Sequence, residues 1–322
     1  MGPRGTETPR RRDFTIAAAV GVLVFGLLTL RFCPNWITYY REYRQAITAA
    51  ESESGRSATR TAFGDTFAAK RGVEVARQAA DLSAEIKDVR HVIVRWRLLM
   101  PALGHFLGLP VWAVLGLAHV GCLFLIAGWV AMIFRASAGS VLEAACFGIV
   151  AGATAPFMTS MGWLGYYDAW LAIGLTVAAF ARPPAWVWLA CLLTPWIDER
   201  FVLGLPLALG VRWLHFAPEA QDSFSWFKRQ AVVPLILVVG FAAVRLRLGG
   251  SGSSQTVREY FNTFIFGRRI EPARLVHGMA AGLRMGWVLV LLAVLGTRRN
   301  SDCTRNFRTG LLVAAILISI LV

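Results

Sequence analysis

The chain has 322 residues, of which 56% are hydrophobic and only 16% are charged. Soluble domains carry about 25% charged residues, so this composition leaves too little polar surface to cover a water-soluble fold. The formal net charge of +14 raises the question of nucleic-acid binding. However, the Arg and Lys residues cluster in short segments between apolar runs, as membrane topology requires. We therefore predict an integral membrane protein and exclude nucleic acid as its partner.

The longest apolar runs predict membrane-spanning helices, because about 20 apolar residues are needed to cross the hydrocarbon core. A basic N-terminus, residues 1–13, precedes the first run, which ends without the small-residue cleavage pattern of a signal peptide. We therefore expect a retained first helix and a cytoplasmic N-terminus. The first four expected helices span about residues 14–32, 108–134, 141–160 and 166–181.

Two shorter apolar runs follow, Ala185–Ile197 and Phe201–Val211, with Asp198, Glu199 and Arg200 between them. One continuous helix through the three charges would cost about 2.5–3.5 kcal/mol for each charge near the membrane centre. A hairpin of two short helices instead places the charges at the outer interface. We therefore favour the hairpin, although the distribution of Lys and Arg over the two sides does not distinguish the two topologies.

The last third of the chain adds expected helices at about 230–247 and 274–297 and a final apolar run, Gly310–Val322. Because a span that stops inside the hydrocarbon is unfavourable, we expect a C-terminal truncation. Between the first two helices, the loop 33–107 carries apolar residues at helical spacing among alternating charges. This pattern is typical of amphipathic helices that lie on a membrane surface.

The predicted fold is thus all-α: a polytopic transmembrane helix bundle of about eight or nine membrane segments, some of them short or broken. It comprises a basic N-terminus (1–13), a first helix (14–32), an extracytoplasmic interfacial helical loop (33–107) and a multi-spanning domain (108–322). The expected location is the inner membrane of a bacterium.

The charged triplet Asp198, Glu199 and Arg200 is the first candidate site. A carboxylate at the mouth of a membrane cavity is weakly solvated, so it can stay protonated as an acid or act as a base. The alternative is that these are interfacial charges that only bound two helices. Tyr167 and Asp168 form a second candidate, on the same expected side as Asp198, with an aromatic belt and a helix cap as the ordinary alternative.

Basic residues form a third candidate site. They are Arg95, Arg97 and His105 before the second helix, and His277 and Arg284 in the helix expected at 274–297. The last two are seven positions apart and share one helix face. An Arg inside an apolar stretch normally faces a cavity or a partner, and Arg and His suit a phosphate or pyrophosphate group. The alternatives are snorkelling to the interface and a structural ion pair with an acid such as Glu143.

Three segments resemble a known family. The stretch Arg95–Leu103 (RWRLLMPAL), followed by Leu107–Pro110, is similar to one that leads into a membrane segment in C-type glycosyltransferases, which are bacterial polytopic proteins that use polyprenyl-phosphate-linked sugars. Gly165–Asp168 and Thr194–Phe201 resemble acidic turns of that group. The resemblance covers about residues 14–215. Those proteins usually carry an acid soon after the first helix, where this chain has only Glu42.

The resemblance implies transfer of a sugar from a polyprenyl-phosphate-linked donor to an acceptor at the extracytoplasmic face. A carboxylate at Asp198, Glu199 or Asp168 would be the base, and Arg97 or Arg284 would hold the lipid phosphate. Further substrate contacts would come from Arg200, Tyr167 and His277. A soluble nucleotide site is not required, because the activated sugar arrives in the membrane.

Two alternatives stay open. Arg284, His277 and the short helices also suit a transporter or flippase of a lipid-linked or anionic substrate. A noncatalytic membrane scaffold would use the loop 33–107 to bind other proteins.

The site residues include no metal ligand and no cofactor is predicted, although a divalent-metal requirement stays open. The predicted partner is a membrane lipid or a lipid-linked sugar, and the sequence identifies no protein partner.

Overall fold

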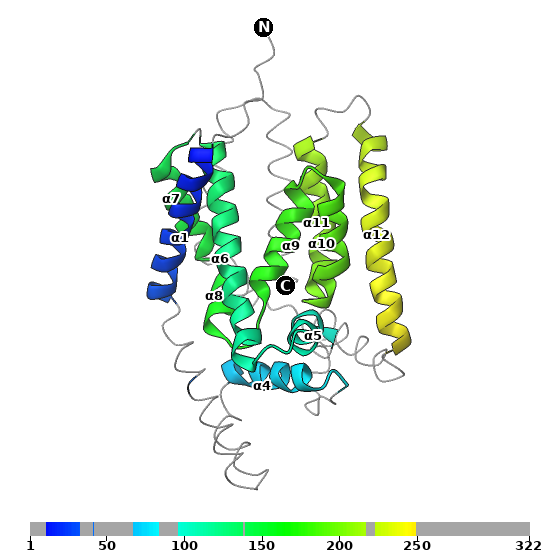
Figure 1. The fold of residues 1–322 in the computed structure, drawn as a ribbon. Helices are drawn as coiled ribbons and strands as arrows, with labels where there is room; N and C mark the ends of the chain where they lie inside the picture. Colours follow the sequence, from blue (N-terminus) through cyan, green and yellow to red (C-terminus); the bar gives the residue numbers. More distant parts are fainter. Residues whose placement is uncertain are drawn as a thin grey trace, which may run out of the picture.

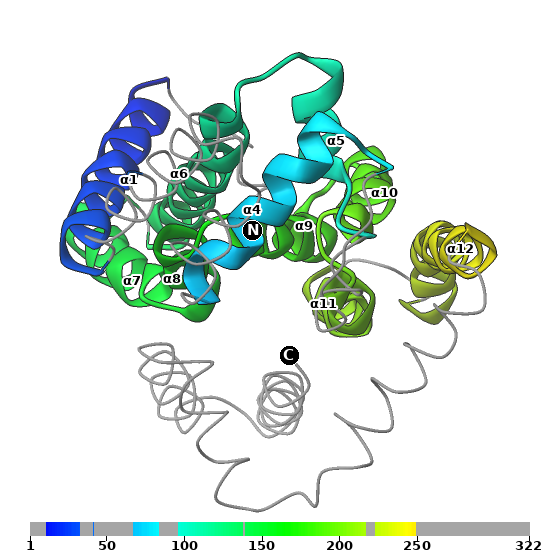
Figure 2. The same cartoon turned by 90° about the horizontal axis from the view of Figure 1, so that it is seen from below.

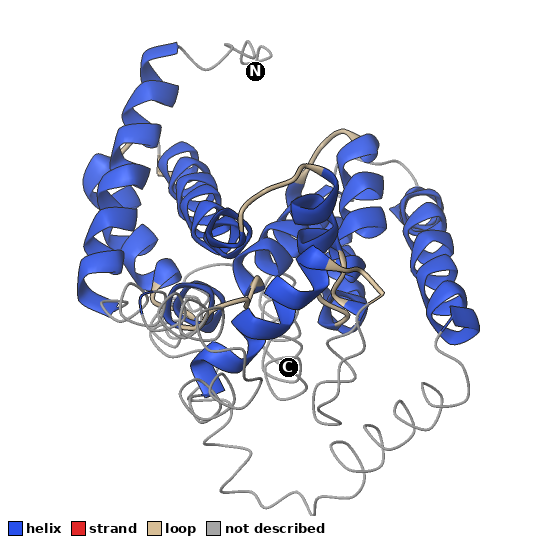
Figure 3. Ribbon diagram, turned by 60° about the horizontal axis from the view of Figure 1, so that its bottom comes forward, coloured by secondary structure: helices blue, strands red, loops and turns tan. Residues whose placement is uncertain are grey.

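The computed structural model describes residues 11–32, 41, 67–83, 96–137, 139–216 and 223–248. Within these ranges the regular elements are helices and no strand occurs (Figure 3), so the predicted all-α class is confirmed there. The helices are α1 (Arg11–Phe32), α4 (Phe67–Ala80), α5 (Leu99–Phe106), α6 (Val111–Ala136), α7 (Val141–Gly152), α8 (Ala155–Gly162), α9 (Asp168–Phe180), α10 (Pro184–Leu193), the 3-10 turn η2 (Thr194–Trp196), α11 (Arg200–Phe216) and α12 (Ser223–Leu248).

Helices α1 and α6 are long and apolar enough to cross a membrane, over Asp13–Arg31 and Val111–Arg135 respectively. They pack against each other closely: a Cβ added at Gly21 would lie 2.9 Å from the Cα of Ala127. On its other side α1 exposes large apolar side chains, such as Leu30, which is 81% exposed. Such an exposed apolar face fits contact with lipid rather than water. The protein is therefore a membrane protein.

The helix expected at 141–160 is broken. It consists of α7 and α8, bent by 65° at residues Ala153 and Thr154, and the pair counts as a third candidate span if both halves belong to one crossing. Pro156 lies in the first turn of α8, where its missing N–H and fixed φ favour a new helix start over continuation. The helices expected at 274–297 and 310–322 lie outside the described residues, so the eight or nine segments stay a prediction.

Helices α9, α10 and α11 form the second half of the bundle (Figure 1). At one end of α9, Arg200 contacts Asp168, and at its other end Arg212 donates a hydrogen bond to the carbonyl of Ala181. Helix α11 therefore runs alongside α9 in the same direction, while α10 returns from Pro184 to Leu193. The charged triplet thus separates two antiparallel short helices, the arrangement that the insertion cost favours.

Helices α4 and α5 lie across the end of the bundle that is opposite to the N-terminus (Figures 1 and 2). The buried face of α4 consists of Arg71, Val75 and Gln78, positions that repeat every three or four residues as one face of a helix does. Val73 and Ala76 are partly buried and pack against the core cluster that contains Val75. Helix α4 packs on the backbone turn at Gly165, whose φ is +76°. The rest of the predicted interfacial loop lies largely outside the described residues.

Candidate functional site

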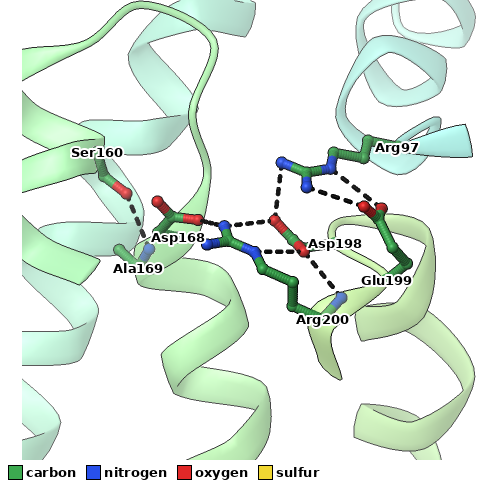
Figure 4. Close-up of polar contacts among 7 residues, drawn as sticks. All are labelled: Arg97, Ser160, Asp168, Ala169, Asp198, Glu199 and Arg200. Carbon is green, nitrogen blue, oxygen red and sulfur yellow. Dashed lines mark hydrogen bonds and ion pairs between the residues drawn. The ribbon is translucent and has the colours of Figure 1, made fainter. Parts of the chain in front are cut away.

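Five charged side chains from three separate parts of the chain meet at the end of the bundle that α4 and α5 cover (Figure 4). Arg97 precedes α5, and Asp168 is the first residue of α9. Asp198, Glu199 and Arg200 join η2 to α11. We refer to these five residues as the charge network. All five are candidate site residues of the sequence analysis, and the structure brings them together.

Asp198 is the centre of the charge network, and its side chain is only 3% exposed. An Nη atom of Arg97 lies 2.9 Å from its Oδ2 atom, and Arg200 donates to it from both Nε and Nη2, at 2.9 and 2.7 Å. Its Oδ1 also accepts the backbone N–H of Arg200 at 2.9 Å, as an Asp at a turn commonly does. One carboxylate is thus held by two guanidinium groups from distant parts of the chain.

The two arginines each bind one further carboxylate. Arg97 donates from Nε and Nη2 to the two oxygens of Glu199, at 3.1 and 3.0 Å, which is the bidentate geometry that the planar guanidinium favours. Arg200 binds Asp168 through Nη2. The network therefore runs from Glu199 through Arg97, Asp198 and Arg200 to Asp168, with charges of alternating sign.

Local structure fixes the Asp168 end of this chain of ion pairs. At the Asp168 end, Ser160 of α8 accepts the backbone N–H of Ala169 at 2.8 Å and so caps the first turn of α9. The side chain of Tyr167 is buried, and its hydroxyl donates to the carbonyl of Val114 in α6 at 3.0 Å. This hydrogen bond fastens α9 to α6, and the expected contact of Tyr167 with substrate stays a prediction.

The ion pairs control the protonation of Asp198. Burial favours the neutral acid, but the charges of Arg97 and then Arg200, together with the hydrogen bonds from Arg200, lower the pKa of Asp198 to about 2. Asp198 is therefore ionised at neutral pH, which differs from the protonated acid that weak solvation alone would favour. In this state Asp198 is a weakly basic carboxylate.

Arg71 is a functional candidate that the sequence pattern did not single out. It lies on the buried face of α4 and is 1% exposed, and its charge acts on those of Arg97 and Glu199. Burial, and then the positive charge of Arg97, lower the pKa of Arg71 to about 10, so the group stays charged at neutral pH. The sequence does not distinguish Arg71 from the other basic residues, because basic residues alternate along the whole loop.

Two predicted site residues, His277 and Arg284, lie outside the described residues. In the part of the chain that is described, no group of three or more His, Cys, Asp or Glu side chains is arranged to hold a metal ion.

A cavity of about 260 Å³ lies at the other end of the bundle, between the start of α1 and the end of α6. It is lined by Asp13, Phe14, Ala17, Ala131, Phe134, Arg135 and Gly139, none of which belongs to the charge network.

Comparison with known proteins adds no assignment to this site: no family model, curated protein or solved structure matches the chain.

The charge network has two chemical properties. It holds guanidinium groups that bind oxyanions bidentately, and it holds carboxylates whose basicity depends on how firmly those guanidinium groups bind them.

Proposed function

We propose that the protein is a membrane glycosyltransferase that moves a sugar from a polyprenyl-phosphate-linked donor to an acceptor hydroxyl. The observation that carries the proposal is the position of Asp198 between Arg97 and Arg200, buried at the end of a membrane bundle. A lipid-linked phosphate reaches the protein at such a membrane–water boundary. There the two arginines supply the positive charge for the phosphate, and the carboxylate supplies a base.

The proposed reaction breaks the bond between the sugar C1 atom and the phosphate oxygen and forms a bond between C1 and the acceptor oxygen. The leaving group is the polyprenyl phosphate, whose developing negative charge Arg97 and Arg200 neutralise. The proton of the acceptor hydroxyl goes to Asp198. When the phosphate engages the arginines, Asp198 loses part of the interaction that stabilises its charged form, so its pKa rises towards that of an effective base.

The proposal includes an orientation. The basic N-terminus favours a cytoplasmic start, and α1 then carries the chain to the opposite side, where α4, α5 and the charge network lie. The sugar would therefore be transferred at the extracytoplasmic face of a bacterial inner membrane. Arg71 and α4 would cover the site from that side.

The test is consumption of a polyprenyl-phosphate-linked sugar by purified protein in proteoliposomes. Asp198→Asn keeps the size of the side chain but removes the base, so we expect the rate to fall by about 100-fold or more. The matched control is Glu143→Gln on α7, because this exposed acid forms its hydrogen bond to Ser140 through the backbone N–H and not the carboxylate. A wild-type rate in Asp198→Asn would exclude Asp198 as the base.

A transporter of the same lipid is the second candidate, and the break between α7 and α8 favours it, since discontinuous helices line substrate sites in many transporters. The same proteoliposomes distinguish the two functions. A transporter moves the lipid-linked sugar across the bilayer and leaves the bond between sugar and phosphate intact, whereas the transferase separates the two groups. If neither change occurs, the network has the structural role of a noncatalytic scaffold.

A further inference from the structure

The cavity at the N-terminal end of the bundle lies between two helices that touch further along, α1 and α6 (Figure 1). Where these helices touch, a Cβ added at Gly21 would lie 2.9 Å from the Cα of Ala127. About one turn closer to this end the corresponding residues are Ala17 and Ala131, and both line the cavity. Helix positions four apart share a face, so these small side chains face each other and leave space between the helices. We refer to this space as the end cavity.

Opposite charges lie on the two walls of the end cavity. Asp13 is on α1, about one turn before Ala17, and Arg135 is on α6, about one turn after Ala131. Both charged residues are exposed, so each is hydrated and can exchange water for a ligand. Among the residues that the structure describes, Asp13 and Arg135 do not form an ion pair with each other. The end cavity therefore presents an acid on one wall and a base on the other.

The end cavity opens where the membrane-spanning part of the bundle stops. Asp13 is the first residue of one candidate span, and Arg135 is the last residue of the other. Charged residues that bound an apolar span lie at the level of the lipid headgroups. Phe14 also lines the cavity and is 64% exposed, which fits contact with an acyl chain rather than with water. The position of the end cavity thus favours a membrane lipid over a soluble ligand.

We propose that the end cavity binds the headgroup of phosphatidylethanolamine, with Asp13 accepting hydrogen bonds from the ammonium group and Arg135 donating to the phosphate oxygens. A headgroup with both charges satisfies both walls, and the guanidinium group suits phosphate oxygens. An anionic headgroup would instead place its charge near the carboxylate of Asp13. The volume of about 260 Å³ is just below the range of about 300–1,000 Å³ of small-molecule sites, so it fits a headgroup and not a whole lipid. Such a site would hold a structural lipid whether or not the protein transfers sugar.

The test is a titration of the purified full chain, in detergent micelles, with phosphatidylethanolamine, in which native mass spectrometry measures the bound lipid. Asp13→Asn and Arg135→Gln each replace a charge with a neutral amide. We expect the apparent dissociation constant to rise about tenfold in each variant, because one charge-assisted contact is lost. The matched controls are Glu143→Gln and Arg182→Gln, which should bind as the wild type does. Both control residues are exposed and lie at the same end of the bundle, outside the cavity lining.

Two other lipids separate the contributions of the two walls. Phosphatidylglycerol has the phosphate without the ammonium group, so Arg135→Gln should weaken its binding and Asp13→Asn should not. Phosphatidylcholine keeps both charges, but three methyl groups prevent its nitrogen from donating a hydrogen bond to Asp13. The wild type should therefore bind phosphatidylcholine about tenfold more weakly than phosphatidylethanolamine. Equal affinity of the wild type for all three lipids would overturn the inference without the use of any variant.

Glycerophosphoethanolamine, which has the same headgroup without acyl chains, distinguishes a lipid from a soluble ligand. It should not displace the lipid at comparable concentrations. If it binds as tightly as the lipid does, the end cavity takes a soluble phosphate ester and the assignment to a lipid is wrong. Unchanged affinity for phosphatidylethanolamine in Asp13→Asn and Arg135→Gln, with thermal unfolding like that of the wild type, would overturn the inference. An equal loss of affinity in the two control variants would also overturn it, because any charge at this end would then act in the same way.

Discussion

At the scale of single residues, the site depends on Asp198. Its carboxylate is 3% exposed and binds one arginine from the segment before α5 and another from the start of α11. A buried ion pair is a weak source of net stability, but removal of one partner leaves an uncompensated charge in a poorly solvated place. The ion pairs of Asp198 with Arg97 and Arg200 therefore contribute both to the folded structure and to the charge of the site.

A double-mutant cycle on Arg97 and Asp198 tests this contribution to folding. Arg97→Gln should destabilise the folded protein by about 3–5 kcal/mol, because it leaves Asp198 and Glu199 with one guanidinium fewer. Adding Asp198→Asn to Arg97→Gln should cost about 1–3 kcal/mol less than the sum of the two single changes. The free energies of unfolding are measured in mixed micelles that contain an increasing fraction of denaturing detergent.

The comparison pair for that cycle is Glu74 and Arg77 on α4, three residues apart, with Arg77 46% exposed. The side chain of Glu74 is 13% exposed, and a pair with one partner in solvent contributes about 0–1 kcal/mol. Additive effects at Arg97 and Asp198, equal to those at the α4 pair, would mean that the buried contacts do not form in the membrane.

At the scale of elements, α4 and the turn before α9 fit each other through glycines. Gly165 has φ of +76°, and a Cβ added there would lie 3.0 Å from the backbone C and O atoms of Arg71. A Cβ at Gly72 would lie 2.8 Å from the Cβ of Leu164. The two backbones are therefore in contact, and this contact places Arg71 beside the charge network.

Gly165→Ala should destabilise the protein by about 1–3 kcal/mol, because alanine is strained at positive φ and its methyl group would press on α4. The control is Gly162→Ala three residues earlier, where an added Cβ meets nothing within 4 Å. Thermal unfolding in detergent checks both variants. Equal stability of the two alanine variants would contradict the close contact between the turn and α4.

The elements differ in how far the sequence predicts them. Long apolar runs define α1 and α6 because burial in lipid demands length and hydrophobicity, and these two properties are visible in any sequence window. The break at Thr154 was missed, since the apolar pattern continues through it and only Pro156 marks a new helix start. Apolar spacing does not predict that the polar side chains of Arg71 and Gln78 lie on the buried face of α4 beside Val75.

At the scale of the whole molecule, the two ends of the bundle are chemically different. The end near the N-terminus has the cavity lined by Asp13, Phe134 and Arg135, and the other end has the charge network under α4 and α5. The insertion cost of three consecutive charges predicts that they lie at an interface, and the shared side of Asp168 and Asp198 follows from counting membrane crossings. The pairing of Arg97 with Asp198 and Glu199 depends on tertiary packing between segments about a hundred positions apart, which no local pattern contains.

The proposed function depends most on where the lipid phosphate binds. A polyprenyl phosphate analogue with a photoreactive group in the isoprene unit beside the phosphate measures this directly, when the labelled peptides are identified by mass spectrometry. We predict that labelling maps to the segments around Arg97 and Asp198 and that unlabelled polyprenyl phosphate suppresses it. Labelling around Asp13 and Arg135 instead, at the cavity between α1 and α6, would contradict the account.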